Sequence, residues 1–388
     1  MRSRLAALVT AALLAASCAS QVPPAQAQAG FGTPERIAPG IEFYTSTDAS
    51  LVAAAGPIAV YLLRLDPARV RIASVLSNDE VVDAEPVAGM AARHHAVAAI
   101  NGGYFNRANG EPVALLKTAG ELVSDSPAIK GAVLIRSPAQ GATDMAFDRI
   151  SARVTASFDF GDTPHELPVD GVDTTRERGK LMLYTPSYHG DTDTAPTGTE
   201  WTLDGSPLRV VDVRPSQGHT PIPRTGAVLS YGGVDLPEVL ADLIPGTIVT
   251  FKTTWKTLGG TPADDLDRAD HIVNGAGLLR RRGQAIADWQ PENLSAQSFT
   301  DARHPRTLIG KDTHGTIWLA AVDGRQPDYS IGMTFADLQR LCDRLGLTDA
   351  LNLDGGGSTT MVVTDRIVNR PSDVSPRPVS DAILVTIR

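Results

Sequence analysis

"ALNLDGGGSTTMVV", residues 350–363, places three successive glycines between two short apolar segments that are typical of buried β-strands. Asp354 stands where the first segment ends, and the hydroxyl side chains of Ser358 and Thr359 follow the glycines. Glycine adopts positive φ without strain and lets backbone N–H groups approach a ligand, so this connection suits an anion or a sugar. A tight turn that needs glycine for its geometry alone would use the same residues. A P-loop is excluded, because no lysine follows the glycines and a strand rather than a helix comes next.

Short β-rich segments bounded by Gly, Pro, Asp and Asn recur on both sides of this stretch. They include "IAVYLLRL" (58–65), "VRIASVL" (70–76), "LMLYT" (181–185), "GTIVTFKTTW" (246–255), "GTIWLAAV" (315–322) and "AILVTIR" (382–388). Helical patterns are fewer. The clearest covers 334–345, where Thr334 and Asp337 form a capping-box pattern and Gly346 ends the helix, and a second covers 85–95. We therefore expect an α+β (mixed α/β) fold in which sheets dominate and helices are few.

Residues 1–29 have the pattern of a secretory signal peptide. Arg2 and Arg4 precede an apolar segment at 5–16, and small residues at the end of the stretch offer cleavage sites. A lipid-attachment site at Cys18 is the alternative interpretation. In either case we expect the protein to be secreted or to lie in the cell envelope.

The remainder of the chain is expected to consist of a tether, residues 30–45, and one domain, residues 46–388, either elaborated or built from two intertwined lobes. The chain has 35 Lys and Arg against 44 Asp and Glu, and this acidic balance argues against a nucleic-acid partner. No segment after the leader is apolar for long enough to span a bilayer. If Cys18 is removed or modified, Cys342 has no cysteine left for an intramolecular disulfide.

A second glycine-containing stretch, "AVAAINGGYFN" (96–106), repeats the pattern of the first. An apolar segment ends at Asn101, and Gly102–Gly103 are followed by Tyr104 and Phe105. Amide groups beside aromatic rings suit a sugar, which presents hydroxyls and an apolar C–H face. Ordinary core packing of the two rings explains the same residues.

Charged side chains gather in two further loops. "ARHPRTLIG" carries Arg303, His304 and Arg306 before a strand, and "AVDGRQ" carries Asp323 and Arg325 after one. Neighbouring guanidinium groups bind phosphate or carboxylate, although a solvated basic loop and an Asp-Gly turn would look the same.

Six motifs in order resemble the phosphodiester glycosidase family. They are "INGGYF", "VNGAGLLRRRGQ", "RHPRTLIG", "AVDGRQPDYSIGMTFADL", "ALNLDGGGSTTMVV" and "RPVSDAILV", spread over residues 96–388. The resemblance implies that residues 46–388 form a catalytic domain that hydrolyses a sugar 1-phosphodiester at its anomeric carbon, releasing the sugar and a phosphomonoester. The segment 150–260 is its least distinctive part.

The resemblance also implies roles for the residues singled out above. We expect Asp354 and Asp323 to supply carboxyl groups near the anomeric carbon, Arg306 to stabilise the leaving phosphate, and His304 to act as acid, base or hydrogen-bond partner. The residues expected to bind the substrate are Asn101, Gly102, Gly103, Tyr104, Phe105, Arg325, Asn352, Gly355, Gly356, Gly357, Ser358 and Thr359.

No cofactor is expected to be required. The chain has no zinc-binding His or Cys motif, but oxygens of Asp323, Asp354 and Asn352 could together hold Ca²⁺ or Mg²⁺. Two other functions fit the same residues. One is a hydrolase of ordinary glycosides or of teichoic-type envelope phosphodiesters, in which the P–O bond could be the one cut. The other is an envelope-glycan binding protein without activity.

Overall fold

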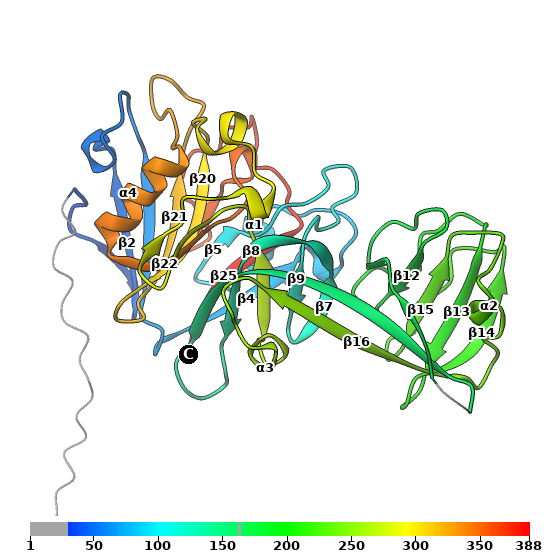
Figure 1. The fold of residues 1–388 in the computed structure, drawn as a ribbon. Coiled ribbons are helices and arrows are strands. Elements are labelled where there is room, and N and C mark those ends of the chain that lie inside the picture. Colours follow the sequence, from blue (N-terminus) through cyan, green and yellow to red (C-terminus); the bar gives the residue numbers. More distant parts are fainter. Residues whose placement is uncertain (1–29, 162–163) are drawn as a thin grey trace, which may run out of the picture.

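The computed structural model describes residues 30–161 and 164–388 (Figure 1). The predicted signal peptide, with Cys18, lies outside the described residues. Within them, no helix is both long and apolar enough to cross a lipid bilayer.

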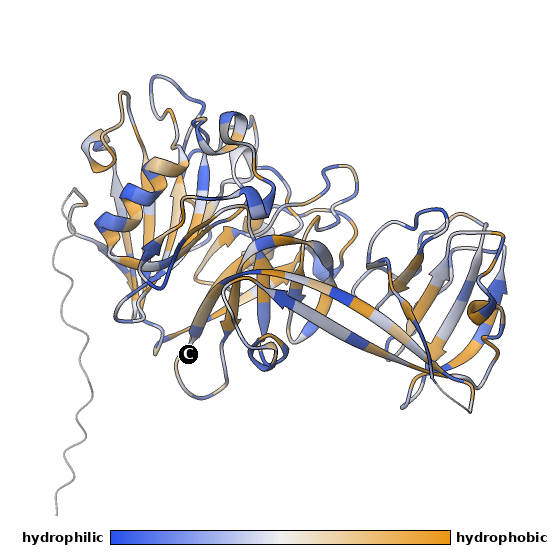
Figure 2. Cartoon of the chain, in the orientation of Figure 1, coloured by the Kyte–Doolittle hydropathy of each residue, from blue (hydrophilic) through white to orange (hydrophobic). Residues whose placement is uncertain are grey.

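An antiparallel eight-stranded sheet forms one side of the main body. In spatial order its strands are β1 (Glu35–Ala38), β2 (Ile41–Ser46), β3 (Val60–Leu65), β21 (Ile317–Val322), β20 (Arg306–Asp312), β22 (Leu347–Asn352), β18 (Leu278–Arg281) and β19 (Gln284–Ala285). One face of this sheet packs under helix α4 (Phe335–Leu345), and the other packs on a second sheet. Figure 2 shows hydrophobic colouring along these strands, as expected for a sheet covered on both faces.

The second sheet of the main body has five antiparallel strands. Their order is β24 (Arg366–Ile367), β23 (Met361–Val363), β5 (Ala98–Asn101), β25 (Asp381–Ile387) and β4 (Val70–Leu76). Helix α1 (Val87–Arg93) covers it with a small apolar cluster, and this helix is shorter than the 85–95 pattern predicts.

A third sheet continues from the main body into a lobe. Its strands in order are β11 (Gly171–Val172), β12 (Leu181–Tyr184), β15 (Ala227–Tyr231), β13 (Thr199–Asp204), β14 (Arg209–Pro215), β16 (Ile248–Thr257), β9 (Asp144–Asp159), β8 (Ser126–Arg136), β17 (His271–Asn274), β6 (Leu116–Thr118) and β7 (Glu121–Ser124), with β10 (His165–Pro168) beside β9. The remaining α-helices among the described residues are α2 (Glu238–Ala241) and α3 (Ala263–Asp267). Short turns of helix cover Ala49–Leu51, Ser77–Asp79, Gln290–Glu292, Ala296–Thr300 and Gly356–Ser358.

We call residues 164–247 the lobe. Strands β9 and β16 pair continuously from Ile150–Thr257 to Asp159–Ile248 and carry the lobe away from the main body (Figure 1). The lobe has its own apolar core, which includes Trp201 and Leu229. It lies inside the 46–388 segment that the sequence predicts as one domain, and that boundary stays a prediction.

Helix α4 forms where the sequence predicts it. Thr334 caps the helix by accepting a hydrogen bond from the backbone N–H of Asp337, the Asp337 side chain accepts one from the backbone N–H of Thr334, and Gly346 ends the helix in the left-handed region. The buried face of α4 includes Cys342, which is a free thiol whose pKa burial raises to about 12. The sheet-dominated part of the predicted fold is confirmed. Because the described helices are few and short, a mainly-β description fits better than α+β.

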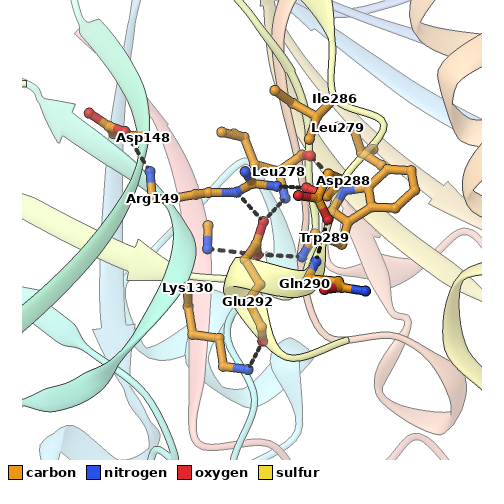
Figure 3. A network of polar contacts seen from close by, with 12 residues as sticks. Lys130, Asp148, Arg149, Leu278, Leu279, Ile286, Asp288, Trp289, Gln290 and Glu292 are labelled. Atoms are coloured by element: carbon orange, nitrogen blue, oxygen red, sulfur yellow. Dashed lines mark hydrogen bonds and ion pairs between the residues drawn. The ribbon is translucent and has the colours of Figure 1, made fainter. Parts of the chain in front are cut away.

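Glu292 joins the third sheet to the first (Figure 3). This fully buried carboxylate accepts hydrogen bonds from the backbone N–H groups of Gly131 in β8 and of Gly277 and Leu278 at the start of β18, at 2.8, 2.9 and 3.1 Å. Arg149 of β9 donates through Nε at 2.8 Å. One charged side chain thus satisfies donors from three strands, and this fixes how the two sheets meet.

Candidate active site

The ends of several strands converge at one edge of the main body. Strand β20 is antiparallel to β21 and β22, so its first residue, Arg306, pairs with Val322 at the end of β21, and Leu308 pairs with Asn352 at the end of β22. Thr307 Oγ1 donates to Asn101 Oδ1 at 2.8 Å and so links β20 to the end of β5 in the second sheet. Residues as far apart in sequence as Asn101 and Asp354, 253 positions, are therefore brought together.

A cavity of about 300 Å³ opens at this edge. It is lined by Tyr104, Arg107, Phe299, His304, Pro305, Arg306, Arg325, Asp354, Gly355, Gly356, Gly357 and Arg377. Four arginines and one aspartate on one cavity make it strongly electropositive, which favours an anionic ligand such as phosphate.

Asp354 is the carboxyl group of the cavity. Its Oδ1 accepts a hydrogen bond from the backbone N–H of Gly355 at 2.8 Å. Burial raises the pKa of Asp354 to about 6, although hydrogen bonds from Ser358 and Gly355 and the nearby charge of Arg377 act in the opposite direction. A carboxyl group with this pKa exchanges protons near neutral pH, as acid–base catalysis requires.

The backbone of Asp354 is held from behind the cavity wall. Asn101 donates through Nδ2 to the Asp354 carbonyl at 2.8 Å, and the Asp354 N–H donates to the Gly102 carbonyl at 3.2 Å. Thr359 Oγ1 lies 3.3 Å from Thr307 Oγ1 in the same buried layer. Asn101 and Thr359 therefore support the loop and do not line the cavity, contrary to the expected direct contact with the substrate.

Arg306 is the most buried cation of the site, with 2% of its surface exposed. Its Nε and Nη2 donate to the backbone carbonyls of Met333, Phe299 and Ala302 at 2.9, 2.6 and 3.0 Å. The guanidinium also lies over the rings of Phe299 and Phe335, 5.3 and 4.9 Å from their centroids. Burial lowers the pKa of Arg306 to about 10, so the side chain remains cationic at neutral pH. No carboxylate among the described residues pairs with it, which leaves its charge available to an anionic ligand.

The glycine run lies between two other arginines. Gly356 has φ +63°, and a Cβ there would stand 3.0 Å from Nη2 of Arg325. A Cβ on Gly357 would overlap the Arg377 guanidinium. Glycine is needed here both for a left-handed turn and for the close approach of the two cations, rather than for the turn alone.

Arg377 differs from the other arginines because it has a carboxylate partner. It pairs with Asp373 at 2.8 Å and donates to Ser358 Oγ at 3.3 Å. Ser358 is buried and lies behind the glycines, so it orients Arg377 and Asp354 without lining the cavity.

His304 is a neutral hydrogen-bond partner in this arrangement. Its Nε2 lies 3.1 Å from the carbonyl of Ser298, which only accepts, so Nε2 carries the proton and Nδ1 accepts from Arg325 Nη2 at 3.3 Å. Burial lowers the pKa of His304, and the charges of Arg306 and Arg325 lower it further. The geometry assigns His304 to positioning Arg325 and leaves neither ring nitrogen free for proton transfer.

Asp323 does not share the cavity with Asp354. Its Oδ1 accepts from Asn369 Nδ2 at 2.9 Å, and its Oδ2 accepts from the backbone N–H of Arg370 at 2.8 Å. Burial raises the pKa of this carboxyl group as well. The expected pair of carboxyl groups at one reacting centre is thus replaced by a single one, with Asp323 holding the neighbouring 369–370 segment.

Two other expected substrate contacts also lie off the cavity. Asn352 is fully buried and donates to the carbonyls of Ala276 and Leu353 at 2.8 and 2.9 Å. Phe105 packs on the apolar cluster under helix α1. The core-packing interpretation of this ring is therefore the one that the structure favours.

Sequence reasoning missed Arg107, Arg377 and Asp381. Asp381 is buried and accepts from the Gly103 N–H at 3.1 Å, and a Cβ on Gly102 would overlap it. Gly102 and Gly103 thus lie against a carboxylate rather than on the cavity. Arg377 and Asp381 lie in "RPVSDAILV", so the motif held the signal, whereas nothing distinguished Arg107 from a solvated loop arginine.

Of the two aspartates expected to help hold Ca²⁺ or Mg²⁺, Asp354 lines the cavity and Asp323 does not. Among the described residues, the carboxylate and imidazole ligands close enough to hold one ion are those of Asp191, Asp193 and His219, in the lobe. Neither Asp354 nor Asp323 belongs to such a group.

The fold and the cavity define a class: a mainly-β protein with an arginine-lined cavity at the strand ends of its main body. Residues 198–386 match the model of the phosphodiester glycosidase family. Asp354, Arg306, Arg325 and Arg377 lie inside the matched segment, whereas Tyr104 and Arg107 precede it.

Related proteins match over shorter segments. An uncharacterized protein of Bacillus subtilis, the SPbeta prophage-derived YomE, is 33% identical over 103 residues, which are 26% of this chain and 16% of YomE. The mouse N-acetylglucosamine-1-phosphodiester alpha-N-acetylglucosaminidase is 28% identical over 122 residues, 29% of this chain and 23% of the mouse protein. The chain therefore spans less than a quarter of the length of these relatives.

One solved structure has the same fold over most of the chain. The crystal structure of a hypothetical protein from Synechocystis superposes with a TM-score of 0.73 over 90% of this chain and 62% of the other, at 23% sequence identity.

Proposed function

We propose that this protein is an exported hydrolase that cleaves the anomeric C–O bond of a sugar 1-phosphodiester. The observation that carries the proposal is the cavity in which one half-buried carboxyl group, Asp354, is accompanied by four arginines. The family match and the name of the mouse relative support the same reaction and suggest N-acetylglucosamine as the sugar. The signal-peptide pattern of residues 1–29 supports export.

In the proposed reaction a water molecule attacks the anomeric carbon. Ionised Asp354 takes a proton from this water, and the oxygen of the water forms the new bond to the anomeric carbon. The bond between the anomeric carbon and the phosphate oxygen breaks, and its electron pair stays with the phosphate. The products are the free sugar and a phosphomonoester. The departing phosphate is already a stable anion, and Arg306, Arg325 and Arg377 stabilise its growing charge, so no general acid is required.

The test is the release of sugar by the purified protein. UDP-N-acetylglucosamine and a simple α-N-acetylglucosaminyl 1-phosphodiester are incubated with the wild type and with Asp354→Asn. We expect release by the wild type and a loss of at least about 100-fold in the variant. Asp349→Asn is the matched control, because Asp349 is a buried carboxylate at the other end of β22, hydrogen-bonded to the Arg282 N–H. Equal turnover by Asp354→Asn and the control would refute the role of Asp354.

The same reaction in ¹⁸O-labelled water separates C–O from P–O cleavage. We expect the label in the sugar. Label in the phosphate would favour the alternative, a hydrolase of teichoic-type phosphodiesters. Saturable binding without turnover would favour a glycan-binding protein, and turnover of neutral glycosides only would leave the arginines without a function.

A further inference from the structure

One wall of the cavity is a hairpin that spans residues 104–113. The Val113 N–H donates to the Tyr104 carbonyl at 3.0 Å, and the Asn106 N–H donates to the Glu111 carbonyl at 2.8 Å. The first half of the hairpin supplies Tyr104 and Arg107 to the cavity. Within the hairpin, Asn109 and Gly110 also donate to the Asn106 carbonyl, and from the main body the Asp83 N–H donates to the Asn109 carbonyl at 2.8 Å. The orientation of the hairpin as a unit depends on such contacts from outside it.

Glu111 attaches this hairpin to Thr174, Thr175 and Tyr188, which we call the base of the lobe. Its Oε2 accepts from Thr174 Oγ1 at 2.9 Å, and its Oε1 accepts from Thr175 Oγ1 at 2.8 Å and from Tyr188 Oη at 3.5 Å. Asn109 adds a second link by donating through Nδ2 to Thr175 Oγ1 at 3.2 Å. The hairpin and its anchors are thus more than 60 residues apart in sequence.

The contact is specific because Glu111 is only 5% exposed and no Lys, Arg or His among the described residues forms an ion pair with it. A buried carboxylate without a cation depends on its hydrogen-bond donors. Here every side-chain donor belongs to the lobe. Movement of the lobe base relative to the hairpin would therefore break these bonds, and the carboxylate resists such movement.

Glu200 provides a comparison inside the lobe. It is 1% exposed and accepts from the hydroxyls of Thr194 and Ser230 at 2.9 and 2.8 Å, so it resembles Glu111 chemically. Its side-chain partners all lie within the lobe, with Arg176 among them. Glu200 stabilises the lobe alone, whereas Glu111 joins the lobe to the cavity wall.

We propose that Glu111 is a positioning residue that fixes Tyr104 and Arg107 by tying their hairpin to the lobe, so that the lobe sets how tightly the cavity holds its substrate. The kinetic part of this inference rests on the proposed function. The effect falls on substrate binding, because Glu111 does not touch Asp354 or the cavity itself.

The kinetic test compares Glu111→Ala and Glu111→Asp with Glu200→Ala, using release of N-acetylglucosamine from UDP-N-acetylglucosamine. We expect KM to rise about tenfold in Glu111→Ala with kcat within about twofold of the wild type, and partial recovery in Glu111→Asp. Glu200→Ala should lose stability with KM unchanged.

A double variant adds a further test. In an Arg107→Gln background, Glu111→Ala should raise KM less than in the wild type, since one of the side chains that Glu111 positions is already gone. An unchanged KM in folded Glu111→Ala, or the same rise in Glu200→Ala, would overturn the proposal.

A second readout does not depend on turnover. Hydrogen exchange of the amides in residues 104–113 should become at least about tenfold faster in Glu111→Ala and stay unchanged in Glu200→Ala. If the wild type releases no sugar, the proposed function fails, and the exchange result still decides the role of Glu111. Unchanged exchange in both variants would refute that role even if the enzyme is active.

Discussion

At the scale of single residues, Asp354 and the glycines after it serve the same cavity in different ways. Asp354 contributes a carboxyl group whose pKa is moved toward neutrality by burial. Gly356 and Gly357 carry no side chain, and this leaves room for two guanidinium groups: a Cβ on Gly356 would crowd that of Arg325, and a Cβ on Gly357 would overlap that of Arg377. The proton chemistry and the phosphate affinity of the site therefore depend on adjacent residues of one loop.

The pH dependence of the reaction should follow Asp354. Its pKa of about 6 is higher than that of an ordinary aspartate, so the ionised form that accepts a proton prevails only above pH 6. We expect kcat/KM to be level above this pH and to fall tenfold per pH unit below it, as measured on UDP-N-acetylglucosamine. A rate that instead rises as the pH falls through 6 would mean that Asp354 acts as an acid.

Gly356→Ala should weaken both the fold and the site. A left-handed residue other than glycine costs about 1–2 kcal/mol, and the new methyl group would displace Arg325. We expect urea denaturation to show this loss and kinetics to show a higher KM. Gly346→Ala is the matched control, because Gly346 has φ +65° with no atom within 4 Å of its added Cβ. A KM that rises equally in both variants would contradict the role of Gly356.

At the scale of elements, strand ends from the first two sheets assemble the site, and buried polar groups fix how both the second and the third sheet meet the first. Asn101 joins β5 to β20, and Glu292 joins β8 and β9 to β18. Neither contact could be inferred from hydrophobic periodicity, which reports only the face that a strand buries.

Glu292→Gln should destabilise the protein by about 3 kcal/mol. The neutral amide loses the charge that pairs with Arg149, and its NH₂ group faces backbone donors that need an acceptor. Chemical denaturation measures the loss, with Glu166→Gln on the exposed strand β10 as the control. A stability within about 0.5 kcal/mol of the wild type would show that the network is not needed.

Much of the main body could be predicted from sequence because its signals are local. The cap and the terminal glycine of α4 mark its ends, and apolar runs mark β3, β4, β21 and β25.

The residues of the cavity could be predicted in part, since Asp354, Arg306 and Arg325 all line it. Asp323, expected beside Asp354, lies off the cavity, since a strand-end aspartate looks the same in sequence whether it faces a cavity or a neighbouring loop. Arg107 and Arg377 were not predicted, because the other residues that line the cavity with them are distant in sequence.

At the scale of the whole molecule, the chain forms a main body with the cavity and a lobe carried on a long two-stranded ribbon (Figure 1). The lobe has an apolar cluster of its own, so it can lose structure before the main body does.

Leu229→Ala tests this division. Leu229 is fully buried in the lobe core, and its truncation should cost about 2–5 kcal/mol. We expect faster hydrogen exchange across residues 164–247 while the strands of the eight-stranded sheet keep their protection. Leu319→Ala, in the core of the main body, should have the reverse distribution. Uniform loss of protection in both variants would mean that the two parts unfold as one.

The continuous pairing of β9 with β16 has an evolutionary consequence. The chain leaves for the lobe and returns on adjacent strands, which lie only about 5 Å apart. Because the two strands already lie side by side, the entropic cost of closing the segment between them depends only weakly on the length of that segment. Insertions, deletions or replacements within the lobe should therefore leave the fold of the main body intact. The lobe could therefore be replaced as a unit during evolution. Because the lobe holds the 104–113 hairpin, each replacement would alter substrate binding without any substitution of the arginines or the aspartate.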